Sequence, residues 1–275
     1  MKRSKMLAWM LLVVMLVGCM AFPAGAEADG ESFSRKKPTV VGQEVTLGEN
    51  VIITFGTYEQ DNNPENGPEP IEWLVLSFAN GSRVLVVSRF ALEYMPHHNH
   101  TDADGNFEMD YTVTWETCDL RAWLNGEFLQ TAFTEAELEK IPTVTVNAKD
   151  DNSDKDMLGG WWGNDTQDRA FVLSMSEAES YFPEEDLRKC QATAYATANA
   201  EARLGRPIDI GTGYTQSDME NCWWWLRTPG EFYGSAMCIS PSGYVSWRAY
   251  KDLSKYQNDN LRIAVRPAIW IELDK

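Results

Sequence analysis

Hydrophobic residues along this chain gather in short runs separated by polar stretches. The densest run, residues 222–230, contains three consecutive tryptophans and ends at Pro229-Gly230. Because each exposed indole would leave a large apolar area in water, the run predicts a strand buried on both faces. A second apolar run, residues 263–271, carries Arg266-Pro267 in its middle. We predict that the two runs are neighbours in one core.

The remaining pattern predicts strands first, helices in the middle and an antiparallel β meander last, which is the α+β class. Asn80-Gly81 lies between two alternating runs and predicts a hairpin. Further strands are expected at 51–55, 71–78, 84–88, 169–173, 236–239 and 244–247. Helices are expected at 114–133, after the capping boxes Thr134/Glu137 and Ser174/Glu177, after Pro183, and at 192–204. Residues 61–70, 95–111 and 148–168 are predicted as polar loops.

Residues 1–26 form a predicted signal peptide, with a basic start, an apolar stretch and small residues. Two processing interpretations remain open. Ala24-Gly25-Ala26 suits ordinary signal peptidase, whereas Leu16-Val17-Gly18-Cys19 resembles a lipobox in which Cys19 is lipidated. Either interpretation makes the protein extracytoplasmic, as a secreted protein or a membrane-anchored lipoprotein. Residues 27–50 are expected to be a flexible linker, and 51–275 a single domain.

The charge of the chain excludes some partners. The net charge is −17, and removing the leader, with three basic and no acidic residues, makes it −20. Nucleic-acid binding needs clustered Lys and Arg, which this chain lacks, so we expect no nucleic-acid partner. Repulsion from anionic lipids leaves an N-terminal lipid as the only expected route to a membrane.

Four cysteines remain outside the leader: Cys118, Cys190, Cys222 and Cys238. An even number in an exported chain allows up to two disulfides, and buried free thiols are an equal alternative. There is no Cys-x-x-Cys, which argues against a structural zinc site.

Four segments carry a resemblance to a known family. They are Phe55-Gly56-Thr57-Tyr58 with Ile71-Glu72-Trp73, the stretch from Thr114 to Asn125, Trp224-Trp225-Leu226-Arg227-Thr228-Pro229-Gly230, and Val265-Arg266-Pro267-Ala268. Through them the chain resembles the bacterial domain of unknown function 6273 family, which is itself similar to the C-type-lectin-like group that includes sulfatase-modifying factors. The resemblance implies an α+β, C-type-lectin-like fold with a mainly antiparallel central sheet, short flanking helices and long polar loops. It implies structural core roles for Trp115, Arg121, Trp123, Trp224, Trp225, Arg227 and Arg266.

The chain lacks the functional motifs of two better-understood groups of relatives, the calcium-dependent lectins and the formylglycine-generating enzymes. Calcium-dependent lectins use a Glu-Pro-Asn or Gln-Pro-Asp loop, which is missing here, and Trp162-Gly163-Asn164-Asp165 only echoes their late Trp-Asn-Asp. Formylglycine-generating enzymes use two cysteines near the C-terminus. The residues that flank Cys222 and Cys238 do not match theirs, so no catalytic residue is assigned.

Two loops hold candidate metal ligands. His97, His98 and His100 share one loop, and neutral imidazoles suit zinc or copper. Asp150, Asn152, Asp154 and Asp156 gather oxygen ligands of the kind that calcium prefers, although the glycine and glutamate of an EF-hand are missing. Calcium is the one cofactor that we consider. For both loops, a solvated polar loop is the competing interpretation.

Aromatic residues in or near turns are the candidate ligand-binding residues: Trp161, Trp162, Phe232, Tyr233, Trp247 and Tyr250. Such side chains give a large contact area with little loss of entropy, although most of the 11 tryptophans must be core. We expect an exported or lipid-anchored surface domain that binds a carbohydrate or protein ligand without catalysis. The alternatives are a divergent sulfatase-modifying-factor-like oxidase and a structural cell-envelope protein.

Overall fold

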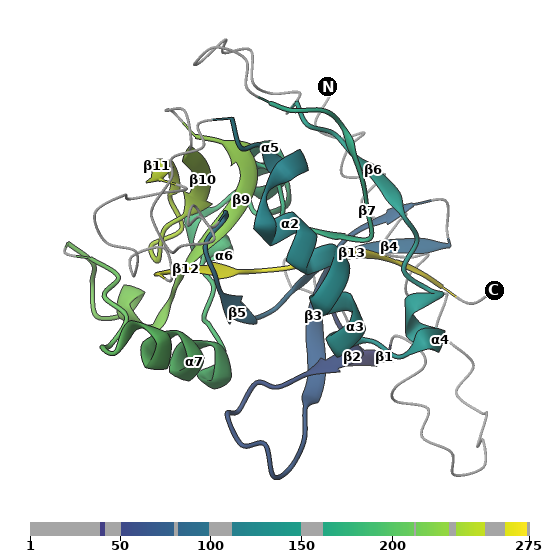
Figure 1. The fold of residues 1–275 in the computed structure, drawn as a ribbon, viewed down its shortest axis with the longest axis horizontal. Coiled ribbons are helices and arrows are strands. Elements are labelled where there is room, and N and C mark those ends of the chain that lie inside the picture. Colours follow the sequence, from purple (N-terminus) through teal and green to yellow (C-terminus); the bar gives the residue numbers. More distant parts are fainter. Residues whose placement is uncertain are drawn as a thin grey trace, which may run out of the picture.

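The computed structural model describes residues 39–41, 51–79, 82–98, 112–149, 162–211, 213–230, 235–250 and 262–273, with backbone alone at 39–41 and 247–250. Its elements form an α+β arrangement, as predicted, with two main sheets and short helices (Figure 1). Within the described residues, no helix has the length and apolar character needed to cross a membrane.

The first sheet contains six strands in the order β1-β2-β3-β4-β13-β8, and every neighbouring pair is antiparallel. Its strands are β1 (Thr39–Val41), β2 (Ile52–Tyr58), β3 (Glu69–Ala79), β4 (Arg83–Ser88), β13 (Ala268–Glu272) and β8 (Ala170–Phe171). The predicted pairing of β3 with β4 is confirmed, while Asn80-Gly81 itself lies outside the described residues. Strand β1 lies inside the predicted linker 27–50 and pairs with β2.

The second sheet contains five strands in the order β11-β10-β9-β12-β5. They are β11 (Val245–Tyr250), β10 (Ser235–Ile239), β9 (Trp223–Pro229), β12 (Ile263–Val265) and β5 (Glu93–Tyr94). The tryptophan run is the central strand, and Trp224 and Trp225 are fully buried. The prediction of an antiparallel meander holds for β9, β10 and β11 but is wrong for β12, which pairs with β9 in parallel.

The last apolar run is two strands rather than one. Strand β12 ends at Val265 in the second sheet, and β13 begins at Ala268 in the first, so Arg266-Pro267 is the crossing point between the sheets. At this point the backbone hydrogen bond from Ser88 N to Pro267 O is 2.8 Å long. Proline fixes its own φ and removes an N–H donor, which suits it to a place where sheet pairing stops.

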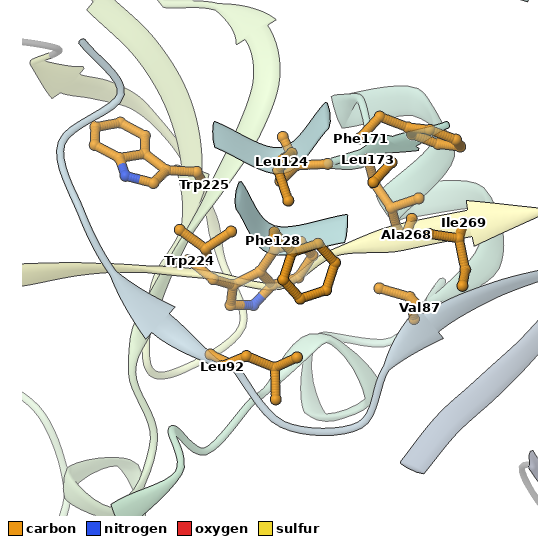
Figure 2. Packing of buried hydrophobic residues seen from close by; sticks show 14 of the residues in the cluster. Val87, Leu92, Leu124, Phe128, Phe171, Leu173, Trp224, Trp225, Ala268 and Ile269 are labelled. Carbon is orange, nitrogen blue, oxygen red and sulfur yellow. The ribbon is translucent and has the colours of Figure 1, made fainter. Parts of the chain in front are cut away.

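A helical stretch contacts both sheets and fills the middle of the molecule (Figure 1). It comprises η2 (Trp115–Thr117), α2 (Asp119–Trp123), the π-helical turn η3 (Leu124–Phe128) and α3 (Leu129–Ala132), within the predicted 114–133. Leu120, Leu124 and Phe128 are buried as their spacing predicts, whereas Trp123 is half-buried. One hydrophobic cluster joins the two sheets through this stretch (Figure 2).

The other helices begin where the sequence places their caps. The predicted capping boxes at Thr134 and Ser174 open α4 (Glu135–Leu138) and α5 (Met175–Tyr181). They are followed by α6 (Glu185–Arg188), α7 (Ala194–Leu204) and the 3-10 turn η4 (Asp218–Glu220). A two-stranded ribbon of β6 (Val144–Val146) and β7 (Thr166–Asp168) was not predicted, and β7 corrects the end of the predicted loop 148–168.

Candidate functional site

The structure describes part of the predicted ligand-binding set. Trp162 is half-buried, and Trp247 and Tyr250 lie on β11, the edge strand of the second sheet, where only the backbone is described. Trp161, Phe232 and Tyr233 lie outside the described residues. These residues therefore remain predictions.

Of the predicted metal ligands, His97 and His98 are described, and they enter different environments. His97 is fully buried, and its ring meets Trp225 edge-on with 5.5 Å between the ring centroids. His98 instead pairs with Asp119, with 3.1 Å between Nδ1 and Oδ2. His100, Asp150, Asn152, Asp154 and Asp156 lie outside the described residues. Calcium thus stays a prediction.

A cluster of three carboxylates, which the sequence did not reveal, lies at the base of the loop between β2 and β3. Glu59, Asp61 and Glu69 each bring one oxygen to within 4.8 Å of the others. Their oxygens also accept backbone hydrogen bonds, from Gln60 N to Glu69 at 2.8 Å and from Asn63 N to Asp61 at 2.8 Å. This arrangement is sufficient to explain the group as organisation of the loop.

Among the predicted core residues, Arg121 and Arg227 lie in separate, partly buried networks. Arg121 donates through Nε to Asp168 over 2.7 Å, and Trp115 Nε1 donates to the same carboxylate over 3.0 Å. Arg227 donates to both carboxylate oxygens of Glu177, over 2.5 and 2.7 Å. Carboxylates pair with these two guanidinium groups at the junctions of helix and strand, as expected for groups that hold a fold together.

An exposed aromatic and apolar surface lies over α6 at the end of the second sheet. Four large hydrophobic side chains are exposed among the described residues, and three of them occur here: Tyr244 (57%), Met219 (56%) and Leu187 (43%). They come from three segments, namely the turn just before β11, η4 and α6. We call these three residues, with Glu185, Lys189 and Asp218, the Tyr244 surface.

A close backbone contact brings the turn that precedes Tyr244 onto α6, and η4 joins them through the ion pair between Lys189 and Asp218. Gly243 adopts φ +87°, and a Cβ at this position would lie 1.9 Å from the carbonyl oxygen of Glu185. Only glycine allows the turn to approach α6 so closely. The buried side chain of Arg188 donates to Gly243 O over 2.7 Å and fixes the same contact. Tyr244, the next residue, is thereby held beside α6.

Charged groups surround the exposed tyrosine and hold one another in place. Lys189 bridges Asp186 at 2.9 Å and Asp218 at 3.1 Å. Hydrogen bonds from Thr215 and Lys189 lower the pKa of Asp218, which keeps it ionised. A hydrogen bond from the Tyr244 hydroxyl to Glu185 raises the pKa of Tyr244, which stays protonated. The surface therefore offers an aromatic ring beside the exposed Glu185 carboxylate and the partly exposed Lys189 ammonium group, which the buried Asp218 holds in place.

The sequence contained one signal for this surface. The turn Pro241-Ser242-Gly243 predicts a strand that starts at Tyr244, and an aromatic residue directly after a turn is often accessible. The contribution of Met219 and Leu187 could not be predicted, because it depends on contacts between segments that are far apart in the chain.

A second polar cluster lies between β5 and α7. Arg203 donates to Glu93 Oε1 over 3.2 Å, and Asn199 Nδ2 lies 3.4 Å from both oxygens of this carboxylate. Burial raises the pKa of Glu93, against the opposing effects of the Tyr94 backbone N–H and Arg203. The carboxyl group therefore binds its proton more tightly in the folded state than in the unfolded state.

This shift predicts how stability varies with pH. The pKa of Glu93 is higher in the folded state than in the unfolded state. The contribution of this group to the free energy of unfolding is therefore fully present below the ordinary glutamate pKa, and it is lost as the pH rises through the folded-state pKa. We expect E93Q to remove this loss, so that its free energy of unfolding falls less than that of the wild type between pH 4 and 8. Urea unfolding at several pH values measures the difference. The exposed E139Q variant changes the charge equally and should keep the wild-type slope.

The fold and site define an α+β domain in which an antiparallel six-stranded sheet and a mixed five-stranded sheet share one core, with an aromatic surface above α6. A family model described as a domain of unknown function (DUF6273) matches residues 81–273. The chain therefore belongs to this family, as the sequence resemblance indicated. Comparisons with curated proteins and with solved structures gave no match.

Proposed function

We propose that this protein is an extracytoplasmic binding domain, secreted or held by a lipid on Cys19, that recognises a carbohydrate through the Tyr244 surface. One observation carries the proposal. Three of the four exposed large hydrophobic side chains in the described part of the chain lie beside the charged residues Glu185, Lys189 and Asp218. Exposed apolar groups that gather around convergent polar groups are characteristic of a binding surface.

The chemistry of the surface favours a carbohydrate over an apolar peptide. A tyrosine ring can stack on the C–H face of a sugar, while carboxylates accept hydrogen bonds from hydroxyl groups and the ammonium group donates them. Glu185, Lys189 and Asp218 are already held by their neighbours, so binding would order few additional side chains. The fold class alone does not favour any ligand.

The oxidase alternative receives no support from the thiols. It needs two reactive thiols or a metal near a cleft. Cys222 and Cys238 lie in the half of the chain where those enzymes carry their cysteines, but Cys222 shares a hydrogen bond with Cys190, and Cys238 shares one with Ser246. Burial also raises the pKa of Cys238, which disfavours the reactive thiolate. We therefore propose binding without catalysis.

Binding to a glycan array of polysaccharides and oligosaccharides tests the proposal. We expect Y244A to weaken binding of any glycan that the wild type binds by about tenfold or more, since aromatic anchors dominate small interfaces. Its melting temperature should change by less than about 2 °C, because the side chain is exposed.

The control variant is F78A, which removes the fourth exposed hydrophobic side chain, on β3 of the other sheet. It should leave glycan binding unchanged. Equal binding by Y244A and the wild type would exclude the Tyr244 surface. Absence of any bound glycan would favour a protein ligand or a structural envelope role instead.

A further inference from the structure

Two cysteines, Cys190 and Cys222, lie next to each other in the core. The backbone N–H of Cys222 donates to Cys190 O over 2.8 Å, and the two thiols share a hydrogen bond. Each residue is 2% exposed. Neither residue lies in a strand, so the pair is joined outside regular sheet pairing. Because the two thiols already share a hydrogen bond, their sulfurs can be bridged without a large backbone movement.

A buried arginine faces the pair. Arg266 is 1% exposed, and its guanidinium carbon lies 5.1 Å from the Trp224 ring centroid and 5.2 Å from that of Phe182. Its Nε donates to Ser88 O over 2.9 Å, but within the described residues its Nη1 has no hydrogen-bond partner and no carboxylate pairs with it. A buried cation without a counter-ion is costly. A thiolate at Cys190 would supply the missing negative charge.

The two thiols differ in acidity. Burial alone would raise the pKa of Cys190, but the hydrogen bond from Cys222 and the charge of Arg266 lower it to about 7. The hydrogen bond to Cys190 and burial raise the pKa of Cys222. When protonated, Cys190 has an acceptor in Gln191 O at 3.4 Å. The thiolate is the nucleophile in disulfide exchange, and Arg266 favours a thiolate within this pair.

We propose that Cys190 and Cys222 form one dithiol site, which becomes a disulfide by exchange with an external disulfide compound. One of the two thiols, as its thiolate, attacks that compound, forms a mixed disulfide and releases one thiol. The other cysteine then loses its proton and attacks the sulfur of the first cysteine, which releases the second thiol. Both electrons pass to the external disulfide, the two protein thiols lose two protons, and the protein gains one S–S bond.

This bond would link the two chain segments that lead into the Tyr244 surface, although the inference does not depend on any ligand there. Lys189 directly precedes Cys190, and Trp223 directly follows Cys222. The loop between the cysteines contains α7 and η4, and η4 carries Asp218 and Met219. Cross-linking the loop restricts the unfolded chain most strongly in this part of the molecule.

Oxidative refolding tests the pairing. The reduced full chain is refolded from urea in a buffer of reduced and oxidised glutathione, its free thiols are alkylated, and peptides are mapped by mass spectrometry. We expect a peptide that links Cys190 to Cys222, with Cys118 and Cys238 alkylated. Alkylation of Cys190 and Cys222, or links from them to other cysteines, would overturn the proposal. In C190S and C222S the remaining cysteine of the pair should be alkylated or carry glutathione, and a link from it to Cys118 or Cys238 would contradict the proposal.

Comparing the melting temperatures of the oxidised and the reduced form of each variant distinguishes the stabilisation by the disulfide from the effect of the substitution itself. Oxidation should raise the melting temperature of the wild type by about 10 °C relative to the reduced protein. C190S and C222S should lose this gain, whatever their reduced stability. C238S removes an equally buried thiol and should retain the gain. A gain that persists in C222S, or disappears in C238S, would refute the disulfide.

Discussion

Replacing Asp168 by alanine is expected to lower the free energy of unfolding by about 3 kcal/mol, because one buried carboxylate holds three segments together. Asp168 is 0% exposed. It accepts hydrogen bonds from Trp115 Nε1 at 3.0 Å, Arg121 Nε at 2.7 Å and Thr166 Oγ1 at 2.6 Å. Its removal leaves the indole N–H and the guanidinium without their acceptor. About a quarter of the Arg121 side chain is exposed, so water offsets part of the loss.

Urea unfolding followed by circular dichroism measures the effect as a lower midpoint with an unchanged slope. The matched control is D165A, three residues earlier, where an exposed carboxylate accepts the Ala148 N–H at 2.8 Å. That variant should cost less than about 1 kcal/mol. If D168A were no more destabilising than D165A, the Asp168 network would not stabilise the fold as we argue.

Local signals in the sequence predicted the features that depend on neighbouring residues. The capping boxes at Thr134 and Ser174 were found because all of their atoms lie within four residues of chain. The buried face of the helical stretch was found because its spacing follows the helix period. The tryptophan strand was found because few environments other than a core accommodate three consecutive indoles.

Features that depend on pairing over long distances could not be predicted. An apolar run has the same sequence pattern whether it forms one strand or two, so the division at Arg266-Pro267 was not predicted. The parallel pairing of β12 with β9 was not predicted either. Four cysteines allow three connectivities, and only the fold brings Cys190 beside Cys222. Asp168 belongs to a stretch predicted as a polar loop, and its partner Trp115 lies 53 positions away. Many residues of the predicted site lie outside the described residues, and their roles remain predictions.

Replacing Trp224 by alanine is expected to cost about 4 kcal/mol, near the upper end for core substitutions. The side chain is 0% exposed, its Nε1 donates to Arg188 O over 3.0 Å, and its ring faces the Arg266 guanidinium. Alanine would create a cavity and remove one of the two aromatic rings that face this buried cation. Urea unfolding of the reduced protein measures the cost without any contribution from a disulfide.

The adjacent Trp223 provides the control, because the same substitution there changes composition equally. Trp223 is half-buried, meets Tyr214 edge-on at 6.1 Å between ring centroids, and donates to Ile210 O over 3.0 Å. We expect W223A to cost about 1–2 kcal/mol, since its site opens to water and leaves a smaller cavity. W224F keeps an aromatic ring beside Arg266 and should recover much of the stability that W224A loses. Equal costs for W223A and W224A would mean that the full burial of Trp224 contributes no more to stability than the half-buried position of Trp223.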